Sequence, residues 1–373
     1  MELTDRHGAW QEDPRVIETI AIDYFSTLFT TLNPSNWEEL NEVIEPVVSN
    51  TMNDLLTRDF QPSEVVHSLN QMHPTSAPSP DGMPPLLYQT FWPLVGDCVT
   101  KSVLDFLNLG VASPNFNETN IILIPKIKNP SLMTDFKPIS LCNVVYKLAS
   151  KILANSMKSM LSSIVSGNQS AFTKSRFIAD NVLVAFETMH HISQKQTRKV
   201  GDMVLKLDMS KAYDRIEWAC LKNIMLRLSF HRKLVVTIMS CVSSEVYFVC
   251  INKQPCGPII PSQGLHQGDH LSSYLFLLCA EGLSALLRCA SKRGLITSIS
   301  VSHHALRITH LFFADYSLIF YRATLEECLE LKRICSLYEK VSSQQFNRNK
   351  TALFFSKNTP QAREEEIKRH FDA

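Results

Sequence analysis

Two hydrophobic segments, each tied to one aspartate, constrain the fold of this chain most. The run MVLKLD (203–208) ends at Asp208, and the run LFFADYSLIF (311–320) places Asp315 between two apolar arms. The first pattern predicts a buried strand, and the second predicts a β-hairpin with Asp315 at its tip. A carboxylate in such a place is costly to bury unless it meets a cation.

The two aspartates have a functional and a structural interpretation. If they converge, they could hold hard divalent cations such as Mg²⁺, which prefer oxygen ligands. Alternatively, Asp208 caps a helix that is predicted to begin at Ser210, and Asp315 is an ordinary turn residue. Three further acidic side chains fall inside predicted helices, which favours solvated or ion-paired roles for them: Asp214, Glu217 and Glu281.

The rest of the chain mixes helical and extended patterns. Apolar residues recur at helical spacing from Asp13 to about Ser68, and the proline-rich stretch from His73 to Pro85 predicts a loop or domain boundary. Further helices are predicted at about 141–161, 210–228 and 271–290, a strand at 121–125, and a hairpin at 246–260. Because there is no βαβ rhythm and no fixed repeat, we predict an α+β fold.

Composition narrows the class of protein. The chain has 373 residues, 45% of them hydrophobic and 20% charged, which is typical of a globular protein of roughly two domains. No segment has the roughly 18 uncharged apolar residues of a membrane span, and the N-terminus lacks the pattern of a secretory signal. The ten cysteines form no C-x-x-C pair, which favours free thiols in an intracellular protein. We expect no membrane partner.

Charge is distributed unevenly. Residues 1–100 contain three basic and 15 acidic side chains, whereas the rest of the chain contains 34 basic and 21 acidic ones. This asymmetry indicates either a polyanion-binding body behind an acidic leader or two domains with unlike surfaces. The segment GLHQGD (264–269) precedes a predicted helix, where backbone N–H groups could meet an anion. Four basic residues could grip phosphates or lie on a solvated face: Lys126, Lys128, Lys137 and Arg176.

The order of these segments resembles one protein family. The segments LKLDMSKAYDRIEW, PSQGLHQGDHLSSYLFLLCAEGLS, LFFADYSLIF and FNRNKTALFFSKNT are similar to motifs of the reverse transcriptase of plant non-LTR (LINE-type) retrotransposons. Upstream, SAPSPDGMPPLLYQTFW, LIPKIKNP and NQSAFTKSRFIADNVLVAFETMH look like leading segments of the same family. The resemblance extends from near the N-terminus to about Thr359.

The resemblance implies a right-hand polymerase with fingers and palm. It divides the chain into an acidic N-terminal linker or extension (1–100), a reverse transcriptase domain (101–357) and a truncated start of the thumb (358–373). Within the domain, the fingers are expected at about 101–200 and the palm at about 201–357. The thumb is thus expected to be largely missing.

The resemblance also implies residue roles. Asp208 and Asp315 match the catalytic aspartates that hold two Mg²⁺ ions (Mn²⁺ is the alternative), one activating the primer 3′-hydroxyl and the other neutralising the triphosphate. Lys350 matches a palm lysine thought to protonate the leaving group. The positions that match nucleotide-binding residues are Lys126 and Lys137 in the fingers, Tyr213 under the incoming sugar, and Gln267, Gly268 and Asp269 in a loop that lines the nucleotide and template.

Two departures from the family pattern bear on activity. The family hairpin reads Phe-Ala-Asp-Asp, whereas this chain has Tyr316 after Asp315. A tyrosine phenol has a pKa near ~10, so it offers a metal no negative charge at neutral pH. Lys137 stands where the family has arginine, and it lacks the bidentate fork that matches a phosphate. We expect a catalytic defect on the order of a hundredfold or worse.

The leading hypothesis is an RNA-directed DNA polymerase domain of a LINE-type element, acting on an RNA template, a DNA primer and dNTPs, with weak or absent activity in this copy. The alternatives are a non-catalytic nucleic-acid-binding remnant and an unstable remnant. Because target-primed reverse transcription happens at chromosomal DNA, the resemblance implies the nucleus. The template, the oligomeric state, and a thumb, endonuclease or ribonuclease H supplied elsewhere stay open.

Overall fold

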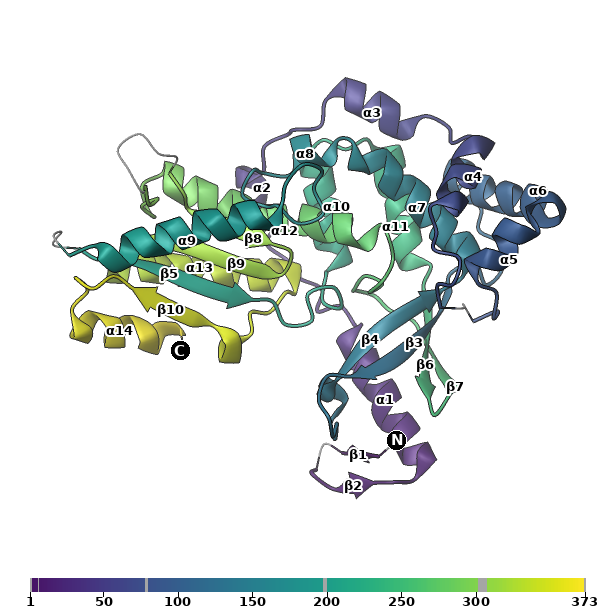
Figure 1. Ribbon diagram of the computed structural model, residues 1–373, viewed down its shortest axis with the longest axis horizontal. Helices are drawn as coiled ribbons and strands as arrows, with labels where there is room; N and C mark the ends of the chain where they lie inside the picture. The colour runs from purple at the N-terminus through teal and green to yellow at the C-terminus, as the bar shows by residue number, and fades with distance from the viewer. Residues whose placement is uncertain (1, 6, 78–79, 197–199, 301–306, 372–373) are drawn as a thin grey trace.

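Two four-stranded sheets lie in separate parts of the molecule (Figure 1). The computed structural model describes residues 2–5, 7–77, 80–196, 200–300 and 307–371. The aspartate sheet, in the order β10-β5-β9-β8, consists of Asp202–Asp208 (β5), His310–Phe313 (β8), Tyr316–Arg322 (β9) and Ala352–Phe355 (β10). The lysine sheet, in the order β4-β3-β6-β7, consists of Glu118–Pro125 (β3), Phe136–Cys142 (β4), Val246–Ile251 (β6) and Gln254–Ile259 (β7). This mixture of sheets and helices confirms the predicted α+β class.

Helices supply most of the remaining structure. The N-terminal part contains a short hairpin of Leu3–Thr4 (β1) and Trp10–Gln11 (β2), followed by Pro14–Leu28 (α1), Glu38–Val43 (α2), Asn50–Thr57 (α3), Pro62–Asn70 (α4), Pro85–Thr90 (α5) and Trp92–Leu104 (α6). The later helices are Val144–Lys158 (α7), Leu161–Ile164 (α8), Ile178–Gln194 (α9), Trp218–Arg227 (α10), Arg232–Ser243 (α11), Ser272–Lys292 (α12), Leu325–Ser342 (α13) and Gln361–Phe371 (α14). Short non-α helical turns occur at Asp105–Leu109, Met133–Asp135 and Arg348–Lys350.

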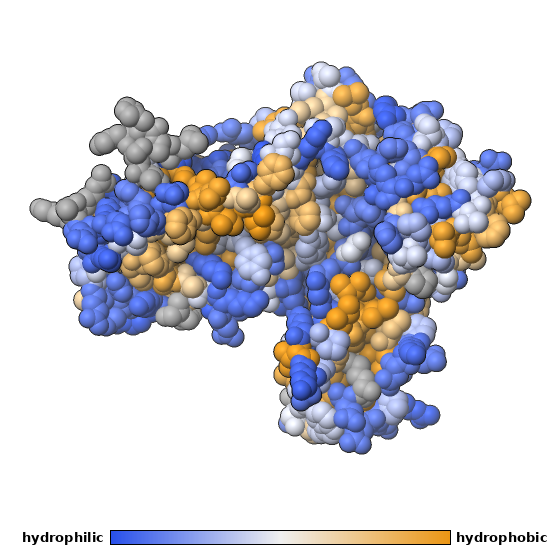
Figure 2. Space-filling model, in the orientation of Figure 1, coloured by the Kyte–Doolittle hydropathy of each residue, from blue (hydrophilic) through white to orange (hydrophobic). Residues whose placement is uncertain are grey.

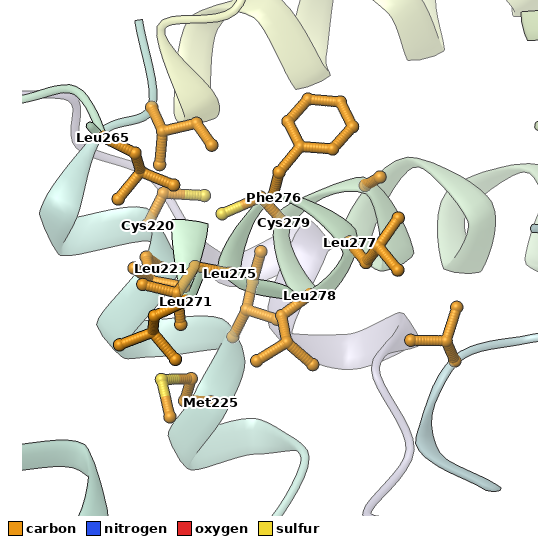
Figure 3. Packing of buried hydrophobic residues seen from close by; sticks show 14 of the residues in the cluster. Cys220, Leu221, Met225, Leu265, Leu271, Leu275, Phe276, Leu277, Leu278 and Cys279 are labelled. Atoms are coloured by element: carbon orange, nitrogen blue, oxygen red, sulfur yellow. The ribbon is translucent and has the colours of Figure 1, made fainter. Parts of the chain in front are cut away.

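Helix α12 forms the centre of the largest hydrophobic cluster, as predicted for a buried helix. Figure 3 shows Leu275 and Leu278 of α12 facing Leu221 and Met225 of α10. By length and composition alone, α12 could cross a membrane, although it contains Glu281 and Arg288 and therefore is not an uncharged segment of the kind expected for a membrane span. In the structure, 78% of its most hydrophobic 18-residue window is buried inside the protein.

The acidic N-terminal segment packs against the lysine sheet. Ile17, Ala21 and Phe25 of α1 are buried in a second hydrophobic cluster with Val249 and Ile251 of β6. Charged side chains lie on the exposed side of α1, so the net negative charge of residues 1–100 does not prevent the helix from joining the core. In the stretch predicted as the start of the thumb, α14 packs against α13.

Two predicted helices begin later than the sequence suggested. Residues 141–142 belong to β4, where Cys142 pairs with Thr119, and the helical region is divided between α7 and α8. Residues 210–215 form turns, and the helix predicted from Ser210 begins at Trp218. Here the N–H of Ser210 donates to the carbonyl of Gln345 at 2.7 Å, which fixes a non-helical path.

Apolar side chains gather on one exposed helix. Figure 2 shows them over α9, in the part of the molecule that carries the aspartate sheet. Val182, Leu183 and Phe186 are between 59% and 64% exposed.

All ten cysteines are free thiols, and most of them are buried.

Candidate active site

The two aspartates meet at one end of the aspartate sheet. Strand β5 ends at Asp208, which pairs with Tyr316 across the β5–β9 register. Asp315 lies in the tight turn between β8 and β9, beside Ala314 with its φ of 50°. The N–H of Met209 donates to the carbonyl of Asp315 at 3.2 Å, so the two acidic positions are neighbours. The predicted strand and hairpin are therefore confirmed, with Asp315 at the hairpin tip.

A lysine forms an ion pair with the buried Asp208. Asp208 is 5% exposed, and the Nζ of Lys350 lies 3.1 Å from its Oδ2. The hydrogen bond to Asp208 raises the pKa of Lys350 above its ordinary value. Burial raises the pKa of Asp315, and the charge of Asp208 adds to that rise, whereas Lys350 and Lys137 lower it. The alternative role of Asp208 as a helix cap is wrong because no helix begins at Ser210.

Two of the predicted nucleotide-binding side chains, Tyr213 and Lys137, interact electrostatically with Asp315. Tyr213 stacks on Phe276 of α12, with ring centroids 5.3 Å apart. Burial raises the pKa of Tyr213, and the charge of Asp315 contributes to the rise. Lys137 is exposed on β4, and Lys126 is exposed just after β3, where its Nζ donates to the carbonyl of Thr134 at 3.0 Å. The structure thus brings one cation of the lysine sheet, Lys137, close to Asp315, whereas Lys126 interacts with Asp214 and Lys211.

The loop 263–269 meets the turn that follows Asp208. The N–H of Gly264 donates to the carbonyl of Ile216 at 2.8 Å, and the N–H of Leu265 donates to the carbonyl of Tyr213 at 2.9 Å. Gly264 has a φ of 98°, and a Cβ there would lie 2.9 Å from the carbonyl oxygen of Asp214. Such a close approach requires glycine.

Within this loop, Asp269 points inward. Its carboxylate is buried and accepts from the Ser150 hydroxyl at 2.5 Å and from the Leu271 N–H at 3.2 Å. Burial raises the pKa of Asp269, while these hydrogen bonds lower it. The expected anion site before α12 is therefore filled by the chain's own carboxylate. Gln267 is half-buried and Gly268 is exposed, so their predicted contacts with nucleotide and template stay a prediction.

The three acidic residues that were expected to be solvated or ion-paired are all buried, and two of them, Asp214 and Glu217, precede α10 and do not lie inside a helix. Burial raises the pKa of Asp214 to about 6, although Lys211 and Lys126 lower it. Glu217 accepts from the Thr31 hydroxyl at 2.6 Å.

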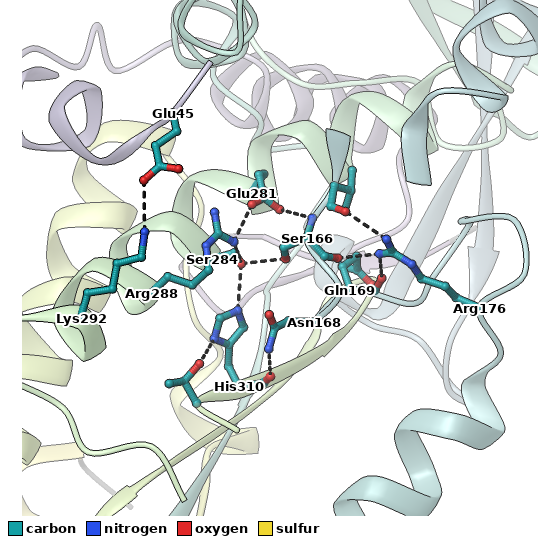
Figure 4. A network of polar contacts seen from close by, with 12 residues as sticks. Glu45, Ser166, Asn168, Gln169, Arg176, Glu281, Ser284, Arg288, Lys292 and His310 are labelled. Atoms are coloured by element: carbon teal, nitrogen blue, oxygen red, sulfur yellow. Dashed lines mark hydrogen bonds and ion pairs between the residues drawn. The ribbon is translucent and has the colours of Figure 1, made fainter. Parts of the chain in front are cut away.

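Glu281 is the third of these acidic residues. It forms an ion pair with Arg288 at 2.6 Å and accepts from the N–H of Ser166 at 3.0 Å (Figure 4). The ion pair is one of the two roles expected for Glu281. The contacts with Thr31 and Ser166 could not be predicted, because these partners come from distant parts of the chain.

Arg176 does not face a phosphate-binding surface. Its guanidinium donates to four backbone carbonyls, those of Ser162, Val165, Ser166 and Gln169, at 2.5–3.1 Å (Figure 4). Its donors therefore hold one loop together.

Sequence reasoning also missed a residue that positions the hairpin tip. The side-chain oxygen of Gln169 accepts from the N–H of Ala171 at 3.0 Å and from the N–H of Ala314 at 3.2 Å. Gln169 is 1% exposed. A lone glutamine gives no spacing signal, so nothing in the sequence could have identified this role.

The donor set at the hairpin fits a divalent cation only in part. Asp208 and Asp315 offer carboxylate oxygens, which Mg²⁺ prefers. Within the described residues, no group of three or more His, Cys, Asp or Glu side chains could hold a metal ion. Tyr316, 49% exposed, stands directly opposite Asp208 where a further carboxylate would enlarge the set.

Comparison with known proteins identifies what the chain is similar to. Residues 124–368 match the family described as reverse transcriptase (RNA-dependent DNA polymerase). An uncharacterized 149 kDa protein of transposon TX1 from Xenopus laevis is 26% identical over 350 residues, which cover 92% of this chain and 26% of that protein. An uncharacterized mitochondrial protein of Arabidopsis thaliana is 54% identical over 65 residues, which cover 17% of this chain and 53% of that protein.

Mobile elements of insects provide a further relative. A retrovirus-related Pol polyprotein from the type-1 retrotransposable element R2 of Nasonia vitripennis is 24% identical over 240 residues, covering 64% of this chain and 22% of that protein. The chain therefore spans about a quarter of the length of the transposon TX1 protein and less of the R2 polyprotein.

Proposed function

The chain belongs to the reverse transcriptase family, and from this premise we propose that it is the polymerase domain of a non-LTR (LINE-type) retroelement. In this proposal it extends a DNA primer on an RNA template, and Tyr316 impairs its activity. The observation that carries the proposal is the meeting of Asp208, Asp315 and Lys350 at one sheet end. The names of the relatives, a transposon protein and a retrotransposable-element polyprotein, support the retroelement origin.

The residues at the sheet end have separate tasks in this proposal. Asp208 and Asp315 would hold Mg²⁺, which neutralises charge on the triphosphate and makes the primer hydroxyl a better nucleophile. Lys350 is positioned to give a proton to the departing pyrophosphate, because its ammonium lies beside Asp208. The ring of Tyr213, fixed by stacking on Phe276, would support the sugar of the incoming nucleotide.

Tyr316 is the residue that we expect to limit catalysis. It pairs with Asp208 across the strands, so it would be a near neighbour of any cation that Asp208 holds. A neutral phenol in that place removes negative charge from the donor set and adds a ring. Because each ~1.4 kcal/mol of lost transition-state stabilisation is tenfold in rate, even partial loss of metal binding would be readily measured.

Primer extension on an RNA template, with Mg²⁺, tests the proposal. We expect Tyr316→Asp to extend the primer at least about tenfold faster than the native chain, since it restores a carboxylate donor. Tyr316→Phe is the matched control, because it keeps the ring and adds no charge, and it should show no gain. Asp208→Ala should abolish extension.

The other outcomes separate the alternatives. If the native chain extends the primer fast and Asp208→Ala does not, the proposed impairment by Tyr316 is contradicted, while the proposed polymerase activity is supported. If no variant extends and the chain still binds RNA or DNA in a salt-sensitive way, the non-catalytic binder is favoured. The observation that favours this second candidate is the Lys350–Asp208 ion pair, which already neutralises one of the two carboxylates. As part of the retroelement proposal, we also propose that the protein acts in the nucleus.

A further inference from the structure

Lys211 lies in a turn whose backbone is held in an unusual conformation. The turn joins β5 to α10, and Lys211 has a φ of 54°, in the left-handed region that side chains other than glycine rarely adopt. Two contacts fix the turn: the N–H of Ser210 donates to the carbonyl of Gln345, and the side chain of Gln344 donates to the carbonyl of Ala212 at 2.7 Å. Backbone strain that persists in this way is often found at functional sites.

A tyrosine of the N-terminal helix holds the ammonium group of Lys211. The Nζ of Lys211 donates to the hydroxyl of Tyr24 in α1 and lies 4.2 Å from the centroid of its ring. Tyr24 in turn contacts the buried ring of Phe25 edge-on, at 5.1 Å. A cation over an aromatic face is attracted by the ring, so α1 determines where this positive charge sits.

The surroundings of Lys211 leave its charge incompletely compensated. Among the residues that the structure describes, no carboxylate forms an ion pair with it. The pKa of Lys211 is lowered to about 8, mainly by burial and also by the nearby charges of Arg215 and Lys126, although Asp214 raises it. A charged ammonium that is half-buried beside other cations is more stable when a bound polyanion neutralises this cluster of cations.

The place of this cluster suggests its ligand. Lys211 is three residues beyond Asp208, and its neighbour Lys126 lies just after β3 of the lysine sheet, whose Lys137 interacts with Asp315. Resting on the proposed function, we propose that Lys211, positioned by Tyr24, is a further phosphate-binding cation of the nucleotide site. The N-terminal helix α1 therefore sets the affinity of the chain for the polyphosphate of its substrate.

Calorimetric titration of the full chain with inorganic tripolyphosphate, in EDTA, tests this inference without catalysis or metal. The main variant is Lys211→Met, which keeps the apolar stem against Tyr24 and removes the charge. We expect it to weaken binding about tenfold, as for the loss of one charge-assisted hydrogen bond. Lys211→Arg should retain most of the affinity, and Tyr24→Phe, which removes only the hydroxyl, should cause a smaller loss.

Two further variants make the outcomes distinguishable. Lys222→Met removes an exposed charge of the same sign from α10 and should bind as the native chain does. If Lys211→Met also binds like the native chain while Lys126→Ala is weakened, the role of Lys211 is overturned and the proposed nucleotide site survives. If the native chain does not bind, or neither lysine matters, the proposed nucleotide site itself is overturned. Thermal melts show whether each variant is folded.

Discussion

At the scale of single residues, the fold decides the charge of several buried histidines. His310 is fully buried on β8, where its Nε2 lies 2.8 Å from the Ser284 hydroxyl and its Nδ1 lies 2.8 Å from the Thr309 hydroxyl (Figure 4). Burial lowers its pKa to about 3, and the charge of Arg288 adds to the effect. His310 is therefore neutral over the whole range in which an exposed histidine gains a proton.

This neutral histidine predicts a loss of stability in mild acid. In the unfolded chain the imidazole has a pKa of about 6.5, so below that pH the unfolded state binds a proton that the native state does not. Stability should fall as the pH falls, by about 2 kcal/mol from this group between about pH 6.5 and pH 5. Urea unfolding at pH 6.5 and at pH 5 gives the loss in free energy of unfolding, which should be smaller for His310→Gln than for the native chain by about 2 kcal/mol. Equal losses in the two proteins would contradict it.

The buried pair Glu245 and His266 is a less direct test of the same effect. Nδ1 of His266 lies 3.1 Å from Oε1 of Glu245, and both side chains are 1% exposed. Burial raises the pKa of Glu245 well above its ordinary value and lowers the pKa of His266 to about 3. The two shifts contribute to the pH dependence of stability with opposite signs. Among the described residues, His310 has no such partner carboxylate, so its variant tests only the loss of stability in acid.

At the scale of elements, the segment 166–181 ties the hairpin strand β8 to the helices. The N–H of Phe312 donates to the carbonyl of Asn168 at 2.7 Å, and the carbonyl of Phe312 accepts from Ser170 and from the side chain of Asn181. The same segment carries Gln169, which holds the N–H of Ala314. Since Asp315 is the next residue, this segment fixes the hairpin tip.

Arg176 should be the most sensitive point of that segment. Arg176→Gln removes the donors of four backbone carbonyls, and we expect a loss of about 2 kcal/mol in unfolding free energy. Lys174→Gln is the matched control, because it removes the same charge from an exposed neighbour and should change stability by less than about 0.5 kcal/mol. Denaturant unfolding provides both values, and limited proteolysis should find the segment 166–176 more open only in Arg176→Gln.

At the scale of the whole molecule, the N-terminal residues complete the structure around the site. Helix α1 covers one face of the lysine sheet, and Thr31 after it donates to Glu217 beside α10. The side chain of Gln263 donates to the carbonyl of Leu28 at 2.8 Å. The end of α1 therefore contacts both loops that approach the aspartates.

Truncation of a buried side chain on α1 tests this integration. Phe25 is 1% exposed and stacks on Phe29 at 5.7 Å. We expect Phe25→Ala to cost about 3–5 kcal/mol, the range for a large aromatic removed from a core. Val16→Ala, at a position on the same helix that is 37% exposed, should cost less than about 0.5 kcal/mol. Similar small losses in both variants would mean that α1 does not belong to the cooperative core.

The sequence alone determined the elements whose signals are local. Alternating and continuous apolar runs predicted β5, the β8–β9 hairpin, the hairpin that turns at 252–253, and the buried helix α12. The sequence also identified Asp208 and Asp315 as candidate site carboxylates, because a strand end and a hairpin tip can be recognised from adjacent residues.

Only the tertiary structure decided the features that depend on distant partners. The turn at 210–215 replaces a predicted helix because segment 344–345 takes up its backbone groups. Asp269 turns inward because Ser150 of α7 lies there, and Tyr24 meets Lys211 from 187 positions away. Periodicity reports which residues are apolar along one element. It does not report which polar group of another element will satisfy a buried donor, carboxylate or ammonium, and that is what fixed the geometry of this site.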